Sequence, residues 1–158
     1  MAKITLTLPD GKKITPLPGQ NLFELSHGDS GLVLAATLDG HLCPLDTAPD
    51  RSARLEWVTY SDKPGLEVYQ RSACFILNMA VAEMSHNTRL VIGHSISNGF
   101  YYDFYCGTPV TQELLNGITA KMRDIIGLDL PFRRQLLPRA EAIRYFDGRA
   151  MSDSRRLV

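Results

Sequence analysis

Most of the side chains that could do chemistry lie close together in one stretch of the sequence. An imidazole and several hydroxyl or amide groups come first, and a run of aromatic residues follows: His94, Ser95, Ser97, Asn98, Phe100, Tyr101, Tyr102, Asp103, Phe104 and Tyr105. Histidine exchanges protons near neutral pH, and exposed tyrosine rings can stack on a base. The polar residues also suit a turn whose side chains bond the local backbone. Both interpretations stay open at this point.

The aromatic run reads as a strand, and strand alternation divides it into two faces. Successive side chains point to opposite sides of a strand. One face therefore holds Phe100, Tyr102 and Phe104, and the other holds Tyr101, Asp103 and Tyr105. We expect one of these faces to be core, which leaves the other as the candidate for binding.

The common catalytic and metal-binding patterns are missing from this sequence. No spacing resembles a Ser–His–Asp or Cys–His arrangement, and the candidate metal ligands do not cluster. Cys43, Cys74 and Cys106 are far apart and form no CxxC pair, which predicts reduced thiols rather than a disulfide framework or a zinc ribbon. We expect Cys74 to be a small buried hydrophobe. The phosphate-binding GxxxxGK[ST] loop is also absent.

Composition indicates an ordinary folded protein. The 158 residues carry 17 basic and 17 acidic side chains and no net charge, so bulk charge does not indicate RNA binding. The end from Arg133 to Arg156 is locally basic, which we interpret as a solvated surface rather than a phosphate-binding patch. Neither a signal peptide nor a membrane-length apolar run is present, so we expect a soluble, cytoplasmic protein without a membrane partner.

The first sixty residues predict a small sheet with one short helix. Alternation at the start, the turn at 9–11 and the return through Thr15 predict a hairpin. Asn21 is placed to cap a short helix. The Asp39-Gly40 dipeptide predicts a second hairpin, and residues 55–59 a last strand. This order suits a ubiquitin-like β-grasp.

After a linker at 61–65, the apolar spacing changes to that of helices. We expect a long helix over 66–85, strands at 90–92 and 100–105, and a second helix capped by Thr111. A further strand is expected at 131–137. A third helix should follow at 139–146, with Pro138 at its start and Gly148 past its end. The fold class is therefore α+β, with domains at 1–60 and 66–158.

Residues 3–60 resemble a TGS domain, on the Ile-Thr-Leu start, Pro9-Asp10-Gly11 and the Asp39-Gly40 hairpin. Residues 89–104, 129–134 and 139–143 resemble the second N-terminal domain of threonyl-tRNA synthetases, most distinctively in Gly-Phe-Tyr-Tyr-Asp-Phe. This second domain is an editing-domain-like α+β domain, and the resemblance leaves open whether it is truncated at its C-terminus.

The long helix distinguishes two subfamilies. Editing synthetases carry a His-x-x-x-His pair there, but the matching positions here are Arg71 and Phe75. Residues 68–77 instead resemble the same helix in uridine-kinase-like nucleoside kinases. Our leading hypothesis is therefore the non-catalytic binding or regulatory N-terminal region of such a kinase. Its ATP- and magnesium-dependent P-loop domain would lie beyond residue 158. The alternative is the N-terminal region of a threonyl-tRNA synthetase without the editing histidines.

The resemblance implies a residual pocket beside the long helix, and no cofactor or catalytic residue in this part of the protein. A small ligand or nucleotide could bind at this pocket or at the TGS domain. The candidate binding residues are Arg71, His94, Ser95, Ser97, Tyr101 and Asp103. We expect Arg71 to pair with Asp103. Phe75 should fill part of the pocket, because a buried phenylalanine is stabilised by leaving water.

Overall fold

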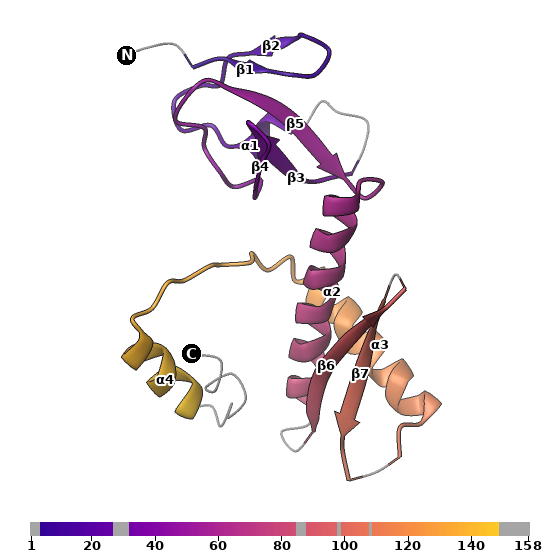
Figure 1. Ribbon diagram of the computed structural model, residues 1–158. Coiled ribbons are helices and arrows are strands. Elements are labelled where there is room, and N and C mark those ends of the chain that lie inside the picture. The colour runs from indigo at the N-terminus through magenta and orange to yellow at the C-terminus, as the bar shows by residue number, and fades with distance from the viewer. Residues whose placement is uncertain (1–3, 27–31, 85–87, 98, 108, 149–158) are drawn as a thin grey trace. The chain divides into compact units, whose positions relative to one another are not determined.

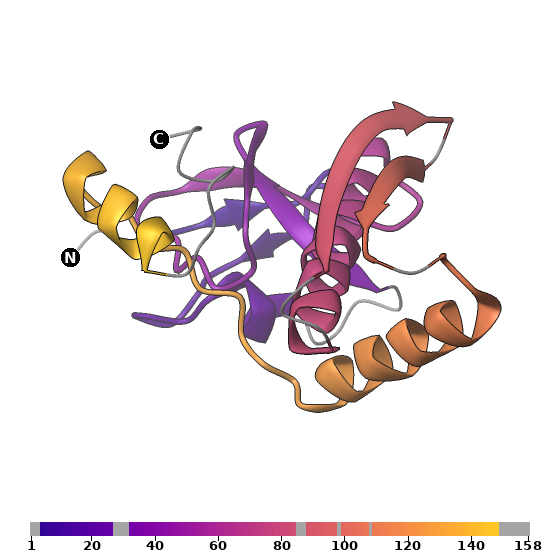
Figure 2. The same ribbon diagram turned by 90° about the horizontal axis from the view of Figure 1, so that it is seen from below.

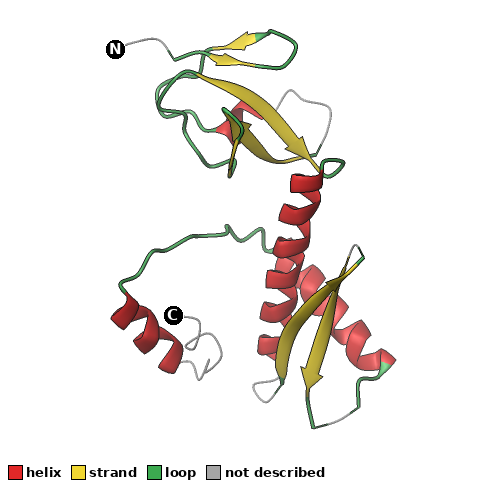
Figure 3. Ribbon diagram, in the orientation of Figure 1, coloured by secondary structure: helices red, strands yellow, loops and turns green. Residues whose placement is uncertain are grey.

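The computed structural model describes the chain except for residues 1–3, 27–31, 85–87, 98, 108 and 149–158. The structure is α+β and divides into two compact units, Met1–Ile126 and Gly127–Val158. Figure 1 labels the elements and Figure 3 colours them by type. The first unit contains two separate sheets, and no ladder among the described residues joins them.

A five-stranded sheet forms the N-terminal part, in the order β2-β1-β5-β3-β4. Strand β1 pairs with β5 in parallel, and the remaining pairs are antiparallel. The strands are β1 (Leu6–Thr7), β2 (Lys13–Ile14), β3 (Val33–Leu38), β4 (His41–Cys43) and β5 (Ala53–Thr59). Helix α1 (Leu22–Ser26) lies between the two hairpins in sequence.

The core of this part is small and aliphatic. Leu6, Leu22, Ala36 and Leu55 are fully buried together. The predicted turns and cap are confirmed: Gly11 and Gly40 have positive φ angles of 83° and 80°, and the Asn21 side chain accepts a hydrogen bond from the Glu24 amide at 2.9 Å. Local turn chemistry and strand alternation therefore lead to this sheet.

Helix α2 (Lys63–Met84) begins almost directly after β5. Asp62 accepts hydrogen bonds from the amide and hydroxyl of Thr59, at 2.7 and 2.8 Å. Gly65 packs so closely on the Thr59 carbonyl that a Cβ at this position would overlap its oxygen. The linker expected at 61–65 is therefore wrong in part, because residues 63–65 form the first turn of the helix. The expected domain boundary itself stays a prediction.

The second sheet is a hairpin of β6 (Arg89–Ile96) and β7 (Gly99–Tyr105). Helix α3 (Gln112–Gly127) follows, and the predicted Thr111 cap is confirmed by a 3.3 Å bond from the Leu114 amide to its hydroxyl. Figures 1 and 2 show the hairpin and α3 on different sides of α2. Lys121 on α3 forms a 2.8 Å ion pair with Glu83 on α2.

In the second unit, an irregular segment leads to α4 (Arg139–Asp147). Pro138 and Gly148 flank this helix as predicted. The strand expected at 131–137 is wrong, because these residues form neither helix nor strand. Pro131 lacks an amide donor, and the described residues supply no partner strand to this segment.

Candidate functional site

Arg71 and Phe75 lie four residues apart on α2, so both project from the same side of the helix. Phe75 is 62% exposed, and the expectation that it would be buried and fill a pocket is therefore wrong. The side of α2 that does bury residues carries small ones, among them Cys74, Ala80 and Val81. A bulky ring at position 75 projects beside this stripe and remains in solvent.

A shallow groove of about 320 Å³ runs between α2 and the hairpin. Its lining comes from one side of α2 and one face of the two strands: Arg71, Cys74, Phe75, Asn78, Ile92 and Phe100. The lining is mostly apolar, and Arg71 is its one charged residue. The Asn78 amide is already used, since its Nδ2 donates to the Cys74 carbonyl at 3.0 Å. The groove can therefore hold an apolar group beside one cation.

The Cys74 sulfur and the Tyr102 hydroxyl lie 2.9 Å apart and share a hydrogen bond. This contact shows that the face of β7 carrying Tyr102 packs against α2. Burial first, and then the hydrogen bond and charge of Cys74, raise the pKa of Tyr102 to about 12. The phenol is therefore protonated at neutral pH and does not serve as a general base beside the groove.

The structure does not bring all the predicted binding residues together. Arg71 lines the groove, whereas Tyr101 and Asp103 lie on the opposite face of β7 by strand alternation. The expected Arg71–Asp103 ion pair is wrong, because none of the ion pairs among the described residues joins them. The assignment of Arg71, Tyr101 and Asp103 as ligand-binding residues stays a prediction.

The polar residues before the aromatic run are also spread out. The His94 ring stacks on Tyr101, with centroids 5.8 Å apart and ring planes within 15°. Ser95 lies opposite Phe100 in the ladder, and Ser97 has a positive φ of 53° at the turn. Asn98 lies outside the described residues. None of His94, Ser95 and Ser97 lines the groove.

Sequence reasoning missed four residues as groove lining: Cys74, Asn78, Ile92 and Phe100. Cys74 is buried, as expected. Its spacing of four residues from Asn78 placed both on one helical side, and the alternation of Phe100 with Tyr102 placed those two on one strand face. The missing information was which face of the strand meets α2.

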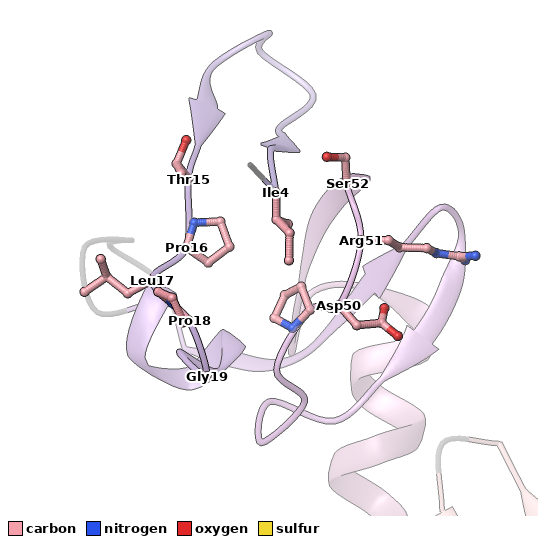
Figure 4. A pocket seen from close by; sticks show the side chains of 10 residues that line it. Ile4, Thr15, Pro16, Leu17, Pro18, Gly19, Asp50, Arg51 and Ser52 are labelled. Atoms are coloured by element: carbon pink, nitrogen blue, oxygen red, sulfur yellow. The ribbon is translucent and has the colours of Figure 1, made fainter. Parts of the chain in front are cut away.

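A larger hollow of about 850 Å³ lies in the N-terminal sheet region, away from the predicted site residues. Figure 4 shows Ile4 and Pro16 beside this hollow, while the Arg51 side chain extends away from it. The Arg51 guanidinium instead lies 3.9 Å from the Asp39 carboxylate. The nearby Ser52 hydroxyl accepts a bond from the Thr5 amide at 2.9 Å. The walls therefore offer shape but few groups for chemistry.

The described part of the chain holds no group of three or more His, Cys, Asp or Glu side chains placed to bind a metal ion. Among the same residues, no helix is both long and apolar enough to cross a membrane. The groove beside α2 offers one guanidinium, an amide, and a thiol hydrogen-bonded to a phenol, against an apolar wall.

Comparison with known proteins finds relatives that match nearly the whole chain. The threonine–tRNA ligase of Granulibacter bethesdensis is 36% identical over 157 residues, which is 97% of this chain and 24% of the relative. The chain is similar to threonine–tRNA ligases. The ligase of Acidiphilium cryptum is 36% identical over 91% of the chain, and that of Geobacter sp. strain M21 is 37% identical over 94%. No family model matches.

These threonine–tRNA ligases are matched in their N-terminal regions, and the chain spans about a quarter of their length. The similarity therefore supports the synthetase hypothesis, which our sequence analysis ranked second. The relatives give no support to the nucleoside-kinase hypothesis, which it ranked first. The likeness to the ligases covers nearly the whole chain, whereas residues 68–77 of α2 were the segment on which we favoured the kinase over the synthetase.

Proposed function

We propose that this chain is a non-catalytic module of the threonyl-tRNA synthetase N-terminal type. In this proposal the five-stranded sheet is a TGS-type β-grasp, and the part from α2 onward is an editing-domain-like unit without hydrolytic activity. The similarity to the synthetase N-terminal regions over 97% of the chain supports this origin. Its role would be binding or regulation, and any ATP or magnesium requirement would belong to a larger parent enzyme.

The proposed loss of catalysis rests on the two side chains that α2 presents to the groove. The resemblance implies an imidazole pair at two positions four residues apart, but Arg71 and Phe75 stand there and line the groove. A guanidinium remains protonated at neutral pH and cannot take a proton from water. A phenyl ring has no acidic or basic group at all. Neither side chain can replace an imidazole in ester hydrolysis.

The remaining groups around the groove do not compensate. Tyr102 keeps its proton, with its pKa raised to about 12. Cys74 is buried, and its thiol is hydrogen-bonded to the Tyr102 phenol. The groove therefore has a cation and an apolar wall, which suits the binding of an ester or an anion rather than its hydrolysis.

The experiment that tests this function is deacylation of seryl-tRNA(Thr) by the purified chain. We expect no more serine release than from a heat-treated sample of the same protein. Release well above that control would overturn the proposal. If the chain is part of a longer protein, the next stretch of the gene gives an independent test: class II synthetase motifs support the synthetase origin, and a GxxxxGK[ST] loop contradicts it.

A further inference from the structure

The face of the β6–β7 hairpin turned away from α2 carries an unusual set of side chains. The Cys74–Tyr102 hydrogen bond places Tyr102 on the inner face. Alternation then places Tyr101, Asp103 and Tyr105 on the other side of β7. Arg89 lies opposite Tyr105 in the ladder, and the His94 ring lies against Tyr101. We call this set the outer face: Arg89, His94, Tyr101, Asp103 and Tyr105.

Both tyrosines of the outer face are about half exposed, Tyr101 at 48% and Tyr105 at 56%. Each ring is also held by a neighbour. The Arg89 guanidinium carbon lies 5.4 Å from the Tyr105 ring centroid, and the His94 ring stacks on Tyr101 at 5.8 Å. The rings are therefore oriented before any ligand arrives, which lowers the entropy cost of stacking on them.

The spacing of these groups along the hairpin has a consequence for the kind of ligand. Tyr101 and Tyr105 are four residues apart on one strand, so about 13 Å separates them at the usual rise. Asp103 lies between them, and a cationic or protonatable side chain stands beside each ring. This arrangement gives two stacking surfaces, one hydrogen-bond acceptor between them, a positive charge for a phosphate beside Tyr105 and an imidazole donor beside Tyr101.

We propose that the outer face binds single-stranded RNA by stacking nucleobases on Tyr101 and Tyr105. Stacking on exposed aromatic rings and arginine planes is how proteins hold unpaired bases. The Arg89 guanidinium complements a negative phosphate next to the base on Tyr105, and the His94 imidazole offers a hydrogen-bond donor to a phosphate next to Tyr101. In a base-paired duplex the bases are already stacked on one another and cannot stack on the tyrosines, so the outer face does not suit a duplex.

Asp103 sets a preference among bases. A carboxylate accepts hydrogen bonds from an exocyclic amino group, such as N4 of cytosine, and cannot donate one to a carbonyl oxygen. Uracil has no amino group, and its one ring donor, N3–H, lies between two carbonyl oxygens that repel a carboxylate, so a uridine strand makes this contact less well. The outer face therefore favours cytidine over uridine. This inference is separate from the proposed function, because it concerns the side of the hairpin away from the groove.

The test is fluorescence anisotropy with the full chain at low salt, using a short labelled oligocytidylate, an oligouridylate of equal length and an RNA duplex. We expect oligocytidylate to bind more tightly than oligouridylate, and the duplex to bind weakly. Replacing either tyrosine of the outer face with alanine should weaken oligocytidylate binding by about fivefold to hundredfold. Tyr101→Phe should bind like the unaltered chain, because the ring face remains.

Two further variants sharpen the result. Tyr69→Ala is the matched control, because Tyr69 on α2 is also about half exposed, at 49%, and is held by an edge-on contact with Tyr60. It should leave binding unchanged. Asp103→Asn should reduce the preference for cytidine, because an amide can also donate to uracil. Circular dichroism checks that each variant is folded.

Three outcomes would overturn the proposal. The first is no binding of either single strand. The second is equal binding of duplex and single strands, or binding that survives loss of both rings, since either would leave only phosphate attraction. The third is concentration-dependent self-association that Tyr101→Ala abolishes while the oligonucleotides fail to bind, which would assign the outer face to a second copy of the chain.

Discussion

Replacement of Phe75 tests whether the groove-lining side of α2, where the imidazole pair is missing, is open to solvent. Because 62% of Phe75 is exposed, little more than a third of its surface leaves water on folding. Full burial of a phenylalanine contributes about 1.5–3 kcal/mol, so the buried part contributes roughly 0.5–1 kcal/mol. We therefore expect Phe75→Ala to lower the free energy of unfolding by about 1 kcal/mol or less.

The same reasoning predicts a small effect for Phe75→His. An imidazole at an exposed position remains hydrated, so the cost of burying an unpaired polar ring does not arise. The assay is urea unfolding followed by circular dichroism, which reports on the helices. Ile118→Ala serves as the core control, since Ile118 is 5% exposed on α3, and it should cost about 2–5 kcal/mol. A loss of 3 kcal/mol or more from Phe75→Ala, in the range of a core phenylalanine, would refute the exposed position.

Three further predictions concern the start of α2 and its contact with the hairpin. Gly65→Ala should destabilise the chain strongly, because its Cβ would overlap the Thr59 carbonyl, and thermal unfolding should show a clear drop in Tm. Asp62→Ala should weaken the start of α2. The hydrogen bonds from Thr59 lower the pKa of the Asp62 carboxyl, so the stabilisation from Asp62 is present at neutral pH and is lost as pH falls through the aspartate range. Acid unfolding of the unaltered chain and of Asp62→Ala should reveal this difference. The pKa of Tyr102 is raised to about 12, so the stabilisation from its protonated phenol is lost as pH rises from about 10 toward that value. Tyrosinate absorbance should show this late titration, and Cys74→Ala should make the titration earlier.

Much of the secondary structure was predictable because its determinants are local. The Asp39-Gly40 turn, the Thr111 cap and the Pro138 start of α4 each follow from the conformation or hydrogen bond that one residue type favours. The strand expected at 131–137 failed because a segment forms a strand only where a partner is present to take its backbone hydrogen bonds. That partner is a property of the fold, which a local pattern does not contain.

The expected linker was wrong in part for a related reason. Pro64 and Gly65 are typical loop residues, but proline also suits the first turn of a helix, and glycine allows close backbone approach. In the structure Gly65 does the latter, against Thr59. Whether such a pair breaks a helix or begins one depends on the strand that precedes it.

The candidate site was predictable in composition but not in arrangement. Alternation correctly separated Tyr102 from Tyr101 and Asp103, yet it could not say which face meets α2. The Cys74–Tyr102 contact decides this, and it also separates Asp103 from Arg71. For Phe75, apolar character suggested burial, whereas the close approach of α2 to its neighbours favours the smaller residues beside it.

The most direct test of the central claim is single-turnover hydrolysis of seryl-tRNA(Thr), with the chain in large excess over the aminoacyl-tRNA so that even one turnover per protein molecule is detected. Because Arg71 and Phe75 stand where the resemblance implies an imidazole pair, we predict that the ester disappears at the rate seen with heat-treated protein. A faster loss of seryl-tRNA that saturates with the concentration of the chain and disappears on heating would contradict the account.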